Sequence, residues 1–183
     1  MKRKALLLLT GFLLLSLLCS LLLSGCGSES EESSGNALTV PLDHIIGAVS
    51  AANAAEYESA FPADFCEAYR AEYPDLDETV EELLLAGKTH DESVYGVDAS
   101  IRYELLSFSE LPLSALESRI LFQGLDEFLY DMPLETVKAA KEIEVRVTRE
   151  GSFSEKNAEL SFVVLQIGDE WLLHPSSFGT LLN

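Results

Sequence analysis

Acid–base chemistry is the first chemistry to test in this chain of 183 residues, because it carries 31 acidic residues and 3 histidines. The histidines are His44, His90 and His174, and no spacing among them suggests a shared site. We interpret His44 as a helix-surface residue and His90 as part of a loop. His174 is predicted at the rim of the domain, at the end of the last strand. None of the three is predicted to be catalytic.

Closely spaced carboxylates are the second candidate for acid–base catalysis. Such a pair works only when one member is desolvated in a pocket, so that its pKa rises toward the working pH. Glu78 and Glu82 are one helical turn apart, with Glu81 beside them, and Glu142 and Glu144 fall on the polar side of a predicted strand. Both groups are predicted to be solvated, so no catalytic carboxylate is assigned.

Metal and cofactor motifs give no candidates. The chain has no HExxH, no CxxC, no Gly-rich phosphate loop and no Gly-x-Ser-x-Gly elbow. Asp75-Leu76-Asp77 lacks the glycine and the closing glutamate of a calcium loop. Cys66 lies between Phe65 and Tyr69, and no motif supplies the positive group that a nucleophilic thiolate needs, which indicates a buried, inert thiol. No metal, cofactor or nucleophile is predicted.

The N-terminus carries a targeting signal. Lys2, Arg3 and Lys4 precede an uncharged, leucine-rich run that ends in Leu23-Ser24-Gly25-Cys26. This order is typical of a secretory signal peptide with a small-residue cleavage site. The run is also just long enough to remain as a transmembrane helix. The small residues after it and the absence of stop-transfer charges favour cleavage.

Leu23-Ser24-Gly25-Cys26 resembles the bacterial lipobox, in which the cysteine is diacylated and becomes the first residue of the mature protein. The resemblance implies lipid attachment, with palmitate as a usable label, at Cys26 and loss of residues 1–25. Two acyl chains anchor a protein stably, whereas one holds it only marginally. The expected location is therefore the cell membrane, lipid-anchored, on the extracytoplasmic face.

The charge of the mature chain limits its partners. Its three leading basic residues leave with residues 1–25, so 9 of 12 Lys and Arg remain against 31 Asp and Glu, a formal charge of −22. Nucleic acid and anionic membrane surfaces both need clustered Lys and Arg, so neither is an expected partner. A protein or small-molecule partner remains open, and the acidic surface could attract cations or basic peptides.

The rest of the chain is predicted to form a flexible acidic segment and one domain. Residues 26–36 hold the lipidated cysteine and a polar tether, and residues 37–183 form the domain. Four helical patterns come first. Pro41 is a first-turn residue of the first, Asn53 caps a short second helix, and Pro62 begins the next, which Pro74 ends. Asp75 or Asp77 begins the last helix, which Gly87 closes.

Strands dominate the second half of the domain. Ile101, Tyr103 and Leu105 alternate with polar residues, and so do Ile143, Val145 and Val147. The segment 158–167 is a long strand, and Gly168-Asp169-Glu170 turns it back into a last strand at 171–174. Between the first two strands, Ser114 and Glu117 form a capping-box pattern that predicts a helix through Leu116, Ile120 and Leu121.

The predicted elements follow one another as N-terminal helices, one strand, one helix and a three-strand meander. This order predicts an α+β fold with N-terminal helices packed on a curved, roughly four-stranded antiparallel sheet. The order resembles the nuclear transport factor-like, or cystatin-like, cone. Val163 to Trp171 resembles the closing hairpin of that group, and Ala51 to Tyr57 followed by Phe61-Pro62 resembles its early helix break in small lipoproteins. The hairpin departs from the usual pattern because an acidic pair stands between glycine and tryptophan.

The superfamily resemblance implies either a binding or assembly module or an enzyme. The favoured hypothesis is a lipid-anchored extracytoplasmic domain that binds a ligand or protein without catalysis. The alternative is an isomerase- or cyclase-type enzyme that uses the cone as its pocket. Tyr103 and His174 are the candidate pocket-lining residues. The predicted core consists of Ile46, Val49, Phe65, Tyr69, Leu83, Ile120, Val145, Val147, Val164 and Trp171.

Overall fold

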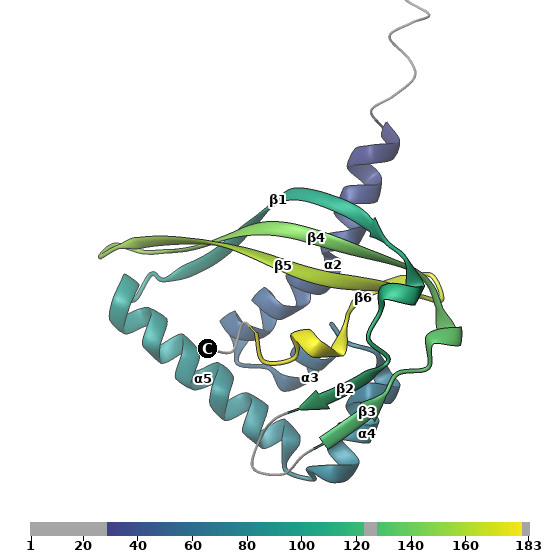
Figure 1. The fold of residues 1–183 in the computed structure, drawn as a ribbon. Coiled ribbons are helices and arrows are strands. Elements are labelled where there is room, and N and C mark those ends of the chain that lie inside the picture. Colours follow the sequence, from purple (N-terminus) through teal and green to yellow (C-terminus); the bar gives the residue numbers. More distant parts are fainter. Residues whose placement is uncertain (1–28, 123–127, 181–183) are drawn as a thin grey trace, which may run out of the picture. The chain divides into compact units, whose positions relative to one another are not determined.

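An antiparallel sheet curves over the helices of this protein (Figure 1). The computed structural model describes residues 29–122 and 128–180, with side chains from residue 37 onward. The chain divides into two units, Met1–Ser34 and Gly35–Asn183, and the sheet and its core belong to the second. Cys26 and the predicted signal peptide lie outside the described residues. Among those described, no helix has both the length and the apolar character needed to cross a membrane.

The four-stranded sheet has the order β1-β4-β5-β6, and a separate hairpin pairs β2 with β3. The strands are β1 (Ser100–Leu111), β2 (Arg119–Phe122), β3 (Phe128–Asp131), β4 (Val137–Glu150), β5 (Glu155–Ile167) and β6 (Glu170–Leu173). The helices are α2 (Glu29–Ala51), α3 (Ala54–Glu58), α4 (Ala63–Glu72) and α5 (Leu76–Tyr95), with short 3₁₀ turns η1 (Leu113–Ala115), η2 (Leu134–Thr136) and η3 (Pro175–Ser177). The prediction of an α+β fold with helices on a four-stranded antiparallel sheet is confirmed.

Side-chain alternation gives the sheet an apolar inner face and a polar outer face. Ile143 and Val145 on β4 are fully buried against the helices. On the outer face, Arg146 forms ion pairs with Glu104 and Glu159 on the two neighbouring strands, at 3.1 and 3.0 Å. The outer face is therefore a solvated surface, as the alternation predicts.

An aromatic cluster fills the space between α4, the β2–β3 hairpin and the C-terminal segment. Phe65 on α4 is fully buried, and its ring centroid lies 5.3–5.4 Å from those of Phe122, Tyr130 and Phe178. Phe178 also contacts Tyr57, Phe61 and Tyr69. These rings belong to the same hydrophobic core as the inner face of the sheet.

Two helix predictions need correction at their ends. The helix predicted to end at Gly87 does not stop there: α5 continues to Tyr95 and ends at Gly96, which has a φ of +115°. A mid-helix glycine costs about 1 kcal/mol relative to alanine, and the buried Asp91 and Tyr95 beyond it offset this cost. His90, predicted in a loop, consequently lies within α5.

The first helix begins earlier than Pro41, which lies inside α2. Its buried face already includes Leu38, one turn before Leu42. The second and third starts are correct: the Asn53 side chain accepts a hydrogen bond from the Glu56 N–H at the start of α3, and Pro62 precedes α4.

The helix predicted through Ile120 and Leu121 is wrong. The chain forms the 3₁₀ turn η1 and then strand β2, which pairs with β3. Ile120 is buried and Leu121 is exposed, a period-two pattern that the four-residue strand is too short to reveal in the sequence.

The predicted core is correct for most of its members. Val49, Phe65, Ile120, Val145, Val147 and Val164 are buried. Ile46, Tyr69 and Trp171 are only half-buried. Leu83 is 43% exposed, because α5 turns its neighbour Leu84 into the hydrophobic core instead.

Candidate functional site

An open groove of about 420 Å³ lies between α2, the end of α3 and strand β6. Ala37, Val40 and His44 come from α2, and Ser59 follows α3. The other wall is the β5–β6 turn and the start of β6, with the residues Asp169, Glu170, Trp171 and Leu172. This volume is within the range of small-ligand sites in proteins.

Trp171 is the only tryptophan of the chain, and it is held in place from the sheet. The ammonium of Lys141 lies 5.7 Å from the Trp171 ring centroid and 4.9 Å from that of Phe108. Lys141 also forms an ion pair with Glu110 at 3.0 Å. A cation over an aromatic ring is attracted by the ring's quadrupole, so the indole is fixed beside the groove.

A histidine–serine contact lies in the same groove. His44 Nδ1 is 2.9 Å from the hydroxyl oxygen of Ser59. The Ser59 hydroxyl donates to the carbonyl oxygen of Glu56 at 2.6 Å. A hydroxyl has a single proton to donate, so the shorter contact takes it and His44 Nδ1 is the donor toward Ser59.

This arrangement differs from an activated serine. A histidine base must accept the serine proton, and a third group must orient the histidine. Here the Ser59 proton is directed to a backbone carbonyl at the C-terminus of α3. The pair therefore caps a helix and gives the groove polar groups that can bind a ligand.

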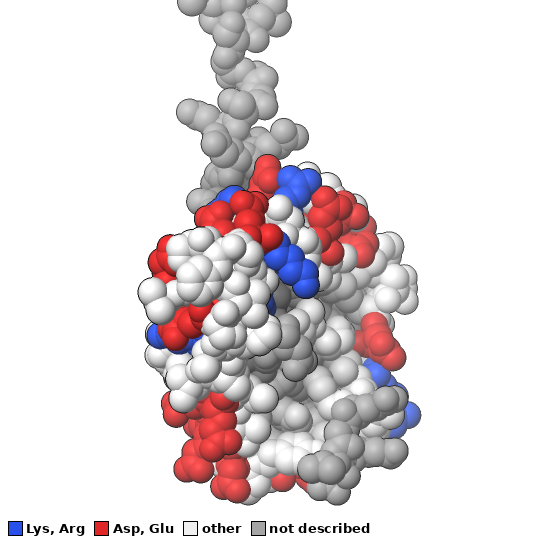
Figure 2. Space-filling model, turned by 90° about the vertical axis from the view of Figure 1, so that its left-hand side faces the viewer, with Lys and Arg blue, Asp and Glu red and all other residues white. Residues whose placement is uncertain are grey.

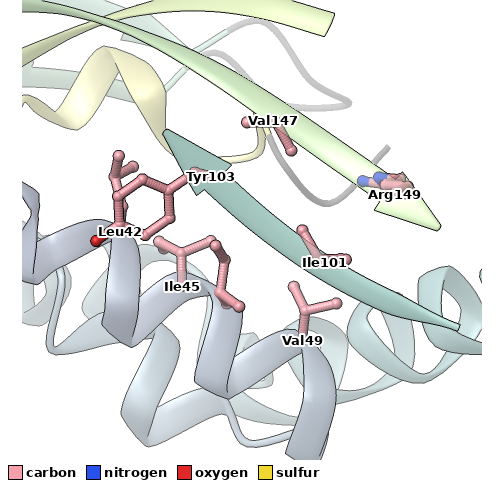
Figure 3. Close-up of a pocket in the computed structure, with 8 residues that line it drawn as sticks. Leu42, Ile45, Val49, Ile101, Tyr103, Val147 and Arg149 are labelled. Carbon is pink, nitrogen blue, oxygen red and sulfur yellow. The ribbon is translucent and has the colours of Figure 1, made fainter. Parts of the chain in front are cut away.

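Tyr103, a predicted pocket residue, lines a second and much smaller pocket between α2 and the sheet (Figure 3). Its free volume is about 10 Å³, no more than a single water molecule needs. The side chains of Leu42, Ile45, Ile101 and Val147 fill the rest. This pocket is part of the hydrophobic core.

The Tyr103 hydroxyl donates to the Asp43 carboxylate at 2.7 Å. Burial raises the pKa of Tyr103 to about 12, and the neighbouring Asp43 acts in the same direction. The phenol therefore stays protonated at neutral pH and ties β1 to α2. We interpret it as a structural residue.

His174, the other predicted pocket residue, is 4% exposed and does not line either pocket. Its Nδ1 lies 2.8 Å from the Ser176 hydroxyl, and its Nε2 lies 3.3 Å from the carbonyl oxygen of Glu117. Burial lowers the pKa of this imidazole. His174 thus links the end of β6 to the segment after η1, whereas the Tyr103 hydroxyl binds α2, so the two candidates belong to different parts of the fold.

Two further buried groups hold the helices together. Burial raises the pKa of the Cys66 thiol to about 12, in agreement with the prediction of an inert cysteine. Glu58 is 8% exposed and forms an ion pair with Arg70, which also contacts Asp77. Burial is the main cause that raises the pKa of Glu58. These contacts join α3, α4 and α5, and none of the residues lines the groove.

Metal binding has no support in the described ranges, 29–122 and 128–180, where no three or more His, Cys, Asp or Glu side chains are grouped to hold an ion. On the face of the molecule that Figure 2 shows, most of the surface is uncharged, and acidic patches are more extensive than basic ones.

No protein-family model, no curated protein and no solved structure matches this chain. The geometry of the groove is therefore the basis for a function. Sequence reasoning singled out Trp171 through the Gly-Asp-Glu-Trp hairpin, but it did not place His44 and Ser59 in a site.

Proposed function

We propose that this chain is a lipid-anchored, extracytoplasmic binding domain whose groove takes a ligand with an apolar body and a cationic end. The observation that carries the proposal is the groove of about 420 Å³ beside the single tryptophan. Ala37, Val40, Leu172 and the indole of Trp171 offer apolar contact, and the carboxylates of Asp169 and Glu170 on the same wall favour a cationic end.

One wall of the groove carries the acidic residues Asp169 and Glu170, which favour a positively charged ligand. Asp169 pairs with Lys138 at 3.3 Å, but both side chains are largely exposed, so this pair is weak. Glu170 has no ion pair or side-chain hydrogen bond among the residues that the structure describes. A cationic ligand would gain a partner at Glu170, whereas an anionic one would be repelled.

A fluorescence titration tests the groove directly, because Trp171 is the only indole. The full chain in nonionic detergent is titrated with n-hexyltrimethylammonium and, separately, with n-hexyl sulfate. We expect a saturable change with the ammonium only. Glu170→Gln should weaken the binding roughly two- to fivefold, as expected for an exposed ion pair of up to about 1 kcal/mol.

Glu78→Gln is the matched control, because it removes the same charge from the exposed surface of α5, away from the groove. It should leave the titration unchanged. Equal binding of the sulfate, or an equal effect of the two substitutions, would exclude charge-selective binding in this groove.

The anchoring part of the proposal is supported by the sequence pattern that ends in Cys26. Cys26→Ser should block processing and abolish labelling with a palmitate analogue, because the thiol that would carry the lipid is gone. Cys19→Ser, within the apolar run, is the control and should leave the labelling intact. Persistent labelling of Cys26→Ser would show that the lipobox assignment is wrong.

A further inference from the structure

We infer that the free edge of β5, from Glu155 to Phe162, accepts an extended peptide with alternating apolar and basic side chains as an added strand. This surface is separate from the groove, and its test does not depend on the proposed function. Strand addition to a sheet edge uses main-chain hydrogen bonds for affinity and side-chain alternation for specificity.

The edge is free because β6 is much shorter than β5. β6 pairs only with Val164–Ile167, and one more bond runs from the His174 N–H to the Val163 carbonyl oxygen at 2.8 Å. In the described part of the chain, no strand pairs with the remaining residues of β5 on that side. In Figure 1, β6 lies beside one end of β5 only.

The hydrogen bond to Val163 also shows which backbone groups of β5 point to the free edge. The carbonyl of Val163 points toward β6, and successive residues of a strand direct their backbone groups to opposite edges. The register with β4 continues without a shift from Leu165 to Glu155. Glu155, Asn157, Glu159 and Ser161 therefore direct their N–H and C=O groups to the open side.

The edge is also regular enough to serve as a template. Proteins protect edge strands with bulges, prolines or charges. β1, at the opposite edge, has a register shift between Leu105 and Ser107. The free part of β5 has no bulge, proline or glycine, and its protection consists of charges alone.

Those charges define the partner. Glu155 and Glu159 lie on the outer face of the sheet, whereas Ala158 and Leu160 lie on the inner face, opposite Val147 and Val145. An added strand would thus place basic side chains beside the glutamates and apolar ones beside Ala158 and Leu160. A second copy would instead bring the same glutamates, on a chain with a formal charge of −19.

Site-resolved hydrogen exchange on the full chain in nonionic detergent tests the inference. The probe is an eight-residue peptide that alternates lysine and valine, and the control peptide replaces lysine with glutamate. We expect new protection at the amides of Glu155, Asn157, Glu159 and Ser161 with the lysine peptide only. The amides of Lys156, Ala158 and Leu160, which face β4, should change little.

Two substitutions separate main-chain pairing from charge. Glu159→Pro removes an N–H that points to the open edge and leaves the β4 ladder intact, a position where proline is tolerated. It should weaken binding of the lysine peptide about tenfold, as expected when one hydrogen bond to the peptide is lost and the adjacent ones are disturbed. Glu159→Gln keeps the N–H and should have a smaller effect that disappears at high salt.

Methylated peptides give the same test without changing the protein. N-methylation of alternate amides on one side of the peptide should abolish binding, and N-methylation of the other set should not. Equal binding of both methylated peptides, or protection without the odd–even alternation, would overturn the inference. So would a loss of binding in Glu170→Gln, which would place the peptide in the groove, or concentration-dependent protection without peptide, which would make a second copy the occupant.

Discussion

Phe65→Ala is expected to lower the free energy of unfolding by about 3–5 kcal/mol, the range for truncating a buried aromatic side chain. Phe65 is fully buried, and its ring stacks on Tyr69 and Phe122 with centroid distances of 5.7 and 5.4 Å. It also contacts Tyr130 and Phe178 edge to face. The cavity left by alanine would remove contacts to α4, to the β2–β3 hairpin and to the C-terminal segment at once. Urea unfolding followed by circular dichroism measures the change.

Phe153→Ala is the matched control for this prediction. Phe153 lies in the β4–β5 turn and is 73% exposed, so the same truncation should change the unfolding free energy by less than about 0.5 kcal/mol. A loss below about 1 kcal/mol for Phe65→Ala would mean that the aromatic cluster is not part of the cooperative core.

The sheet was predictable because its apolar residues alternate over long runs. Val145 and Val147 show the period of two on β4, and both are buried as the pattern requires. The β2–β3 hairpin was not predictable, because four-residue strands show too little of the period. Ile120 therefore fits a helical capping pattern equally well, and only its tertiary contacts distinguish the two.

The groove was less predictable than the fold, because it joins residues that are distant in the sequence. His44 and Ser59 are 15 positions apart, and Trp171 comes more than a hundred residues later. Each is ordinary in its local context: a helix-surface histidine, a serine at a helix end and a tryptophan after a hairpin turn. Only the fold places α2, the end of α3 and β6 around one groove, and no local pattern encodes that arrangement.

Leu83 and Leu84 illustrate a finer limit. Both are leucines on α5. If the apolar face of the helix is predicted one residue out of register, an exposed leucine is assigned to the core in place of a buried one. Leu84 is 1% exposed and Leu83 is 43% exposed. Adjacent residues lie about 100° apart around a helix, so the buried direction depends on how the helix is rotated against the sheet.

Asp91→Asn is expected to lower the unfolding free energy by about 3 kcal/mol, the lower end of the range for breaking a buried ion pair from one side. The Asp91 side chain is 6% exposed, and its carboxylate accepts a hydrogen bond from Arg149 at 2.8 Å. This pair ties the last turns of α5 to β4. The guanidinium that remains is itself only 21% exposed, so it would lose its counter-charge with little compensating solvation.

Asp75→Asn controls for the loss of one negative charge from the same helix. Asp75 precedes α5, is exposed, and makes no side-chain cap hydrogen bond, so its substitution should change stability by less than about 0.5 kcal/mol. The double substitution Asp91→Leu with Arg149→Met should recover most of the loss, because apolar replacement of both partners leaves no unpaired charge. If Asp91→Asn and Asp75→Asn were equally mild in urea unfolding, the Asp91–Arg149 pair would contribute nothing to holding α5 against the sheet.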